Sequence, residues 1–98
     1  MSADPGAETF ANGVTDTGRA FELHQDGALA YADYRAEDGR LIIPHVEAAH
    51  ALRGTGAAGR LMEGVVDAAR RRGLKIVPLC PYADAWMRRH PETADLRA

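Results

Sequence analysis

The chain has 98 residues, which is enough for one domain with a single hydrophobic core and too few for two. Its 46% hydrophobic and 27% charged residues are ordinary for a soluble globular protein. The formal net charge is −2, but residues 1–50 carry nine acidic and three basic side chains, whereas residues 51–98 carry five acidic and nine basic ones. An anionic ligand is therefore expected beside the second half. A solvated helix end would equally account for the basic cluster Arg70, Arg71, Arg72 and Lys75.

The cysteine content and the hydropathy pattern point to a cytoplasmic protein. The single cysteine, Cys80, excludes an internal disulfide and suits a reducing compartment. Residues 1–8 have neither the apolar run nor the basic flank of a signal peptide, and no window approaches the ~18 apolar residues of a membrane span. We expect no membrane or nucleic-acid partner. The four histidines and one cysteine lack the spacing of metal ligands, so no metal site is predicted.

Residues 1–17 are rich in Ala, Asp, Gly and Thr, which is typical of a flexible arm. An ordered stub is expected near Phe10 to Val14. Residues 18–98 then form the folded domain. Three stretches within it alternate like half-buried strands, at residues 19–24, 28–36 and 40–47.

Two short turns join these strands, since each gap contains an Asp-Gly pair that tolerates positive φ. The three strands therefore form an antiparallel meander. In the third strand, the alternation puts Leu41, Ile43, His45 and Glu47 on one face. Pro44 cannot donate to a ladder, so a bulge or an unpaired edge is expected there.

From Thr55 onward the apolar period changes from two to about 3.6, which predicts an amphipathic helix. Gly64 inside it indicates close packing against the sheet, and Gly73 ends it. Residues 74–79 form a fourth strand, parallel to the third because a crossover joins them. A second helix begins at Pro81, with Cys80 at or next to its N-cap. The helical faces expected to be buried are Ala58, Leu61, Met62, Val65 and Ala69 in the first helix, and Ala83, Trp86, Met87 and His90 in the second.

The glycine-rich turn before the first helix fits three phosphate-binding patterns. Gly54-x-Gly56-x-x-Gly59 matches a dinucleotide fingerprint, but Ala48 to Arg53 separates it from its strand and Leu79-Cys80 stands where an acid is required. The chain is also too short for a doubly wound sheet. A nucleotide-triphosphate loop is excluded because Arg60-Leu61 replaces its Lys and Ser/Thr.

The third pattern, Arg53-x-x-Gly56-x-Ala58, resembles the pyrophosphate-binding segment Q/R-x-x-G-x-G/A of the GNAT superfamily of N-acetyltransferases. Val77-Pro78-Leu79-Cys80-Pro81-Tyr82 and His90-Pro91-Glu92 narrow this to the small single-domain GNAT-like family, whose members read V-P-L-C-P-[FY] and H-P-E. His45-x-Glu47 resembles its H-T-E element. The likeness covers roughly residues 19 to 96, with departures at Val46, at Ala48-Ala49 and at Thr93.

The resemblance implies an α/β (α+β) fold, in which an antiparallel β-meander is followed by a β-α-β crossover and a short C-terminal helix. It also implies that acetyl-CoA is the cofactor and that the strands over residues 40–47 and 74–79 splay apart to admit its pantetheine arm. The implied binding residues are Val46, Glu47, Ala48, Arg53, Gly54, Thr55, Gly56, Ala57, Ala58, Gly59 and Cys80.

Four side chains are candidates for catalysis. Cys80 gains thiolate character at a helix N-terminus and could relay the acetyl group, act as a general acid or line the acetyl pocket; the alternative is a small buried hydrophobe. His45 and Glu47 are candidate bases, unless they are only solvated polar groups on the sheet. Tyr82 could protonate the leaving thiolate, as a tyrosine does in several GNAT enzymes, or pack in the core.

Together these features predict acetyl transfer from acetyl-CoA to an unidentified amine, on a small molecule or a protein. Two alternatives remain open. One is a CoA- or acyl-CoA-binding module without turnover, which acts through protein partners. The other is a structural interaction domain whose glycine turn binds nothing. The oligomeric state is left open.

Overall fold

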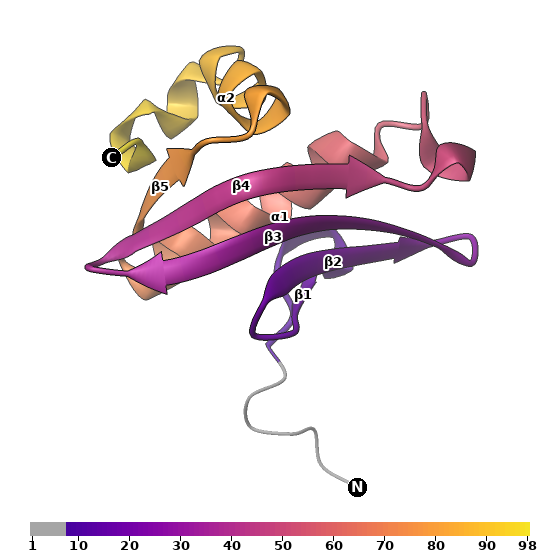
Figure 1. Ribbon diagram of the computed structural model, residues 1–98, viewed down its shortest axis with the longest axis horizontal. Helices are drawn as coiled ribbons and strands as arrows, with labels where there is room; N and C mark the ends of the chain where they lie inside the picture. Colours follow the sequence, from indigo (N-terminus) through magenta and orange to yellow (C-terminus); the bar gives the residue numbers. More distant parts are fainter. Residues whose placement is uncertain (1–7) are drawn as a thin grey trace, which may run out of the picture.

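The computed structural model describes residues 8–98 and has one five-stranded sheet in the order β1-β2-β3-β4-β5. The first four strands pair antiparallel, and β5 pairs parallel to β4. This arrangement confirms the predicted meander and crossover (Figure 1). The strands are β1 (Thr15–Asp16), β2 (Ala20–Gln25), β3 (Ala28–Glu37), β4 (Arg40–Ala48) and β5 (Lys75–Pro78).

Asp-Gly pairs make both long hairpins, as predicted. Asp26 and Gly27 have φ values of 52° and 75°, and Asp38 and Gly39 have 53° and 75°. Two successive residues in the left-handed region match the right-handed twist of the flanking strands. These four residues therefore set the register of β2 on β3 and, up to the pair of Arg35 with Ile42, the register of β3 on β4.

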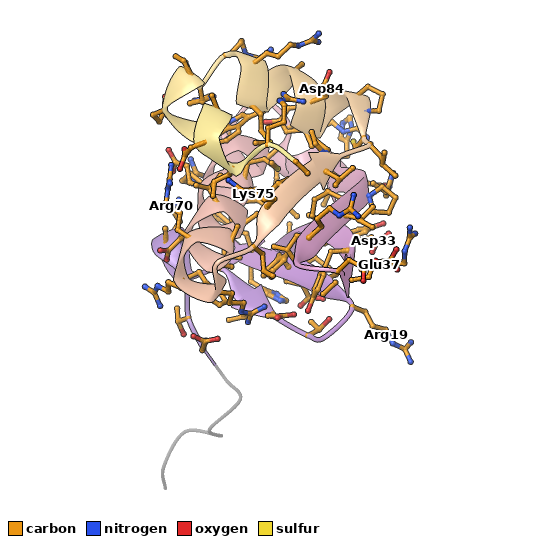
Figure 2. The ribbon with its side chains drawn as sticks, turned by 90° about the vertical axis from the view of Figure 1, so that its left-hand side faces the viewer. Arg19, Asp33, Glu37, Arg70, Lys75 and Asp84 are labelled. Carbon is orange, nitrogen blue, oxygen red and sulfur yellow. The ribbon has the colours of Figure 1, made fainter. Side chains whose placement is uncertain are left out.

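The helix α1 (Ala57–Arg72) crosses one face of the sheet and buries its apolar stripe there. It ends at Gly73, which has a φ of 66° and donates its N–H to the carbonyls of Ala69 and Arg70. Past β5 lie α2 (Pro81–Arg88) and the 3₁₀ helix η3 (Pro91–Leu96). Figure 2 shows the sheet from its end, with α1 and Arg70 on one side and Asp33 and Glu37 on the other. Within residues 8–98, no helix covers that second face.

The segment before β2 packs into the fold, which differs from the flexible arm expected over residues 1–17. Residues 1–7 of that arm lie outside the described residues. Phe10 is 3% exposed and Val14 is fully buried, so the predicted stub is confirmed. Between them lies η1 (Ala11–Gly13), and Asn12 donates its amide to the Arg60 carbonyl at 2.9 Å and to Glu63 at 2.7 Å.

This docking depends on Gly64 of α1. A Cβ at Gly64 would lie 2.3 Å from Cγ2 of Val14, so the glycine leaves the space that Val14 fills. Burial of two large apolar side chains stabilises the segment by about 3 kcal/mol or more. Phe10 and Val14 therefore belong to the same hydrophobic core as the sheet and α1.

A bulge interrupts β4 where Pro44 predicted one. Asp33 pairs with His45 and Arg35 pairs with Ile42, so Ile43 and Pro44 together oppose one residue of β3. The prediction that Leu41, Ile43, His45 and Glu47 share one face of the strand is therefore wrong. An extra residue in a strand reverses the alternation of the side chains that follow it. Leu41 and Ile43 face α1 in the core, whereas His45 and Glu47 do not.

The side chains opposite β4 establish this reversal. Val46 and Ala48 pair with Ala32 and Ala30, which are fully buried under α1. Since directly paired residues point to the same face, Val46 and Ala48 point toward the helix. His45 and Glu47 lie between them in sequence and therefore point to the helix-free face.

Candidate cofactor-binding site

The glycine turn lies between β4 and α1. After Ala48 the chain passes through the 3₁₀ helix η2 (His50–Leu52) and reaches Gly54 and Gly56, whose φ values are 79° and 84°. Leu52 is 3% exposed and anchors the turn in the core. The Thr55 hydroxyl donates to the Leu52 carbonyl and accepts from the Ala57 N–H at 3.3 Å. These bonds hold the turn in its shape.

Gly56 is the N-cap of α1 and offers no side chain to its first turn. The N–H groups of Ala58 and Gly59 therefore lack intrahelical partners, as at the start of any helix. They project at the positive end of the helix dipole. This is the arrangement that accepts phosphate oxygens.

A cavity of about 310 Å³ opens at this point, a size in the range of small-molecule sites. It brings together every predicted residue of the turn except Thr55, whose hydroxyl is bonded to Leu52. Ala48 and Tyr82 close it from β4 and α2. The full lining is Ala48, Leu52, Arg53, Gly54, Gly56, Ala57, Ala58, Gly59 and Tyr82.

A second hollow, of about 280 Å³, lies at the other end of α1 beside β5 and η3. Its basic groups are already paired. Arg70 binds Asp95 at 2.9 Å, and the Lys75 ammonium donates to the Asp95 carbonyl. An anion there would have to compete with these contacts, so the turn is the better anion site.

Two arginines flank the turn in different ways. Arg53 is exposed, and no hydrogen bond or ion pair holds its side chain among the described residues. Arg60 donates to the Thr55 carbonyl at 3.1 Å and to the side chain of Gln25 at the β2–β3 hairpin. The sequence pattern does not predict this hydrogen bond between Arg60 and Gln25. The available signal was an arginine in the first turns of a helix, where the dipole disfavours a cation unless carbonyl groups bind it.

The parallel pairing of β4 with β5 ends at the bulge. The last register pair is Ile43 with Pro78, and the Cys80 N–H then donates to the Ile43 carbonyl at 2.9 Å. Beyond this point β4 pairs only with β3. The backbone from His45 to Ala48 therefore has a free edge, and this edge leads toward the turn.

Cys80 is the N-cap of α2, as predicted, and is 5% exposed within the core. Reactive cysteines are partly exposed. This burial matches the alternative of a small packed hydrophobe. A covalent role for Cys80 would require the thiol to become accessible, and it stays a prediction.

His45 and Glu47 lie together on the helix-free face, with His45 Nε2 2.8 Å from Glu47 Oε1. Both side chains are half exposed. The ring of Tyr31 lies 6.0 Å from that of His45, and desolvation, together with the charge of Glu47, raises the pKa of Tyr31. The carboxylate can orient the imidazole through this contact. The assignment of either residue as a base stays a prediction.

Tyr82 lies in the first turn of α2 and lines the cavity. Burial raises the pKa of its phenol, so the hydroxyl carries its proton at neutral pH. It can donate that proton to an acceptor in the cavity. Tyr82 is therefore both a wall of the site and a possible proton donor.

The described part of the chain has no group of three or more His, Cys, Asp or Glu side chains placed to hold a metal ion. Within residues 8–98, no helix has both the length and the apolar content needed to cross a membrane.

The comparison with known families agrees with the geometry. No curated protein matches the sequence. A family model described as GCN5-related N-acetyl-transferase matches residues 20–96, which includes the meander, the glycine turn, the crossover and α2. The chain therefore belongs to the GCN5-related N-acetyltransferase family and has the minimal fold expected for its small single-domain members.

Proposed function

We propose that the protein binds acetyl-CoA and transfers its acetyl group to an amine. The observation that carries this proposal is the cavity at the start of α1, where unpaired N–H groups, two left-handed glycines and the free side chain of Arg53 meet. Membership of an acetyltransferase family supports the acetyl donor. An anionic pyrophosphate fits this site better than an uncharged ligand would.

Each part of the site has a role in this proposal. The N–H groups of Ala58 and Gly59 and the Arg53 guanidinium would hold the pyrophosphate. Thr55 would act through the shape of the turn. The free edge of β4, from Val46 to Ala48, would hydrogen-bond the pantetheine arm and orient the acetyl carbonyl.

Acetyl transfer also needs two proton movements. The amine must lose a proton before it attacks, and His45 oriented by Glu47 is the candidate acceptor. The leaving thiolate must gain one, and Tyr82 is the candidate donor. Cys80 would line the acetyl pocket at the end of β5.

Calorimetric titration with acetyl-CoA, CoA and NAD tests the binding step. We expect both CoA species to bind and NAD not to bind. Arg53→Ala should weaken CoA binding by about tenfold, because one charged hydrogen bond to phosphate is lost. Arg19→Ala removes the same charge on the far side of the sheet (Figure 2), and it should leave the affinity unchanged. Absence of CoA binding to the wild-type protein would refute the proposal.

Turnover is tested by following thiol release from acetyl-CoA over a panel of amines. Tyr82→Phe should lower kcat more than it changes KM, since the phenyl ring retains the packing but not the proton. Tight binding without acetyl loss for any amine would instead favour a non-catalytic CoA-binding module. The buried thiol of Cys80 is the observation that keeps this second candidate in view.

A further inference from the structure

Trp86, the only tryptophan in the chain, is held in one orientation on α2. Its side chain is 95% buried, since only 5% of its surface is exposed. The His90 ring stacks on the indole with 3.8 Å between centroids and 19° between planes. His90 Nδ1 also donates to the Trp86 carbonyl at 2.7 Å. The stacked His90 ring therefore helps to hold the indole, and with it Nε1, in place.

The indole nitrogen lies next to the first turn of α1. A Cβ on Gly59 would lie 3.4 Å from Trp86 Nε1 and 3.9 Å from the Tyr82 hydroxyl. Gly59 and Tyr82 both line the cavity at the turn. Trp86 itself does not line the cavity, but its Nε1 lies directly behind this part of the lining, next to the space where Gly59 has no side chain.

This N–H has no acceptor in the part of the chain that the structure describes. A buried tryptophan N–H usually has a hydrogen-bond partner, and leaving one without a partner is unfavourable. No side-chain nitrogen or oxygen that is fully cut off from solvent lacks a partner among residues 8–98. Nε1 therefore keeps some access to solvent, and it lies beside Gly59.

We propose that Trp86 Nε1–H is a cofactor-binding donor that bonds an oxygen of CoA beside Gly59. The inference rests on the proposed function and adds a residue that the glycine motif does not include. Two oxygens have the required chemistry: one on the pyrophosphate, held by the same turn, and one on the first carbonyl of the pantetheine arm. Glycine at position 59 keeps the space between them and the indole open.

Replacement of Trp86 by benzothienylalanine tests this, because sulfur replaces the N–H while the shape of the ring is kept. The single tryptophan makes the replacement specific. Calorimetry should show an affinity for CoA about tenfold weaker than that of the wild-type protein, with an unchanged thermal midpoint. Titration with ADP, which carries the pyrophosphate without pantetheine, identifies the oxygen. If the replacement weakens the affinity for both ligands, the bonded oxygen belongs to the pyrophosphate. If it weakens the affinity for CoA alone, the bonded oxygen is the pantetheine carbonyl.

Intrinsic fluorescence of the wild-type protein gives a second readout, since Trp86 is the only emitter of its kind. CoA should change its emission with the same Kd that calorimetry gives. Equal CoA affinity of the wild-type and benzothienylalanine proteins would overturn the inference and leave the proposed function intact. Absence of CoA binding to the wild-type protein would remove both.

Discussion

Substitution of Gly64 by alanine tests the docking of the N-terminal segment on α1. Inside a helix this change normally stabilises a protein by about 1 kcal/mol. Here the new Cβ would lie 2.3 Å from Cγ2, 2.4 Å from Cβ and 2.9 Å from Cγ1 of Val14. Because Cβ of Val14 itself is too close, no rotamer change can relieve the contact. The backbone at Val14 would have to move by about 1 Å to restore an ordinary contact.

Overpacking of a well-filled core costs about 1–3 kcal/mol, and the upper end applies because the clash involves an atom fixed to the backbone. After subtraction of the gain in helix propensity, Gly64→Ala should lower the free energy of unfolding by about 2 kcal/mol. For a domain of this size this corresponds to a fall in Tm of roughly 8–16 °C. Urea denaturation and thermal melting both measure the change.

Gly59→Ala is the matched control in the same helix. A Cβ at Gly59 would meet nothing closer than 3.4 Å, which is an ordinary contact. The gain in helix propensity should therefore remain, and the variant should be as stable as the wild-type protein or slightly more stable. If Gly64→Ala were also stabilising, Val14 would not lie against α1. The folded domain would then begin near β2 rather than at Phe10.

Two further predictions follow from the contacts described above. Gly59→Ala should keep or raise stability but weaken CoA binding several-fold, because its methyl group enters the space beside the Trp86 N–H. Calorimetry measures the change in affinity. An unchanged Kd would contradict the assignment of that space to the cofactor. The hydrogen bond from Arg70 lowers the pKa of Asp95 in the folded state, so this carboxylate stabilises the fold at a pH above its unfolded pKa of about 4. That contribution is lost as the pH falls through the lower folded value, and Asp95→Asn should therefore reduce the urea midpoint at pH 6 more than at pH 3. An equal reduction at both pH values would show that the ion pair does not contribute.

Local chemistry in the sequence determined the arrangement of the elements. The Asp-Gly pairs demand two left-handed residues, which produce tight hairpins, and the change of period from two to 3.6 at Thr55 marks the passage from sheet to helix. Gly73 ends α1 for the same conformational reason. The glycine turn and the segment from Val77 to Tyr82 were sufficient to indicate the family. All of these signals act over a few neighbouring residues, so they can be read without the fold.

Features that depend on distant contacts were decided by the tertiary structure. The composition of residues 1–17 is that of an arm, yet Phe10 and Val14 are buried, and Gly64, fifty residues after Val14, leaves the room that Val14 fills. Pro44 indicated a bulge, but only its register against β3 showed that His45 and Glu47 face away from Leu41 and Ile43. The hydrogen bond from Arg60 to Gln25 and the proximity of Trp86 Nε1 to Gly59 connect elements that are far apart in the chain. Periodicity describes which face a residue occupies within one element, whereas packing between elements determines what that face meets.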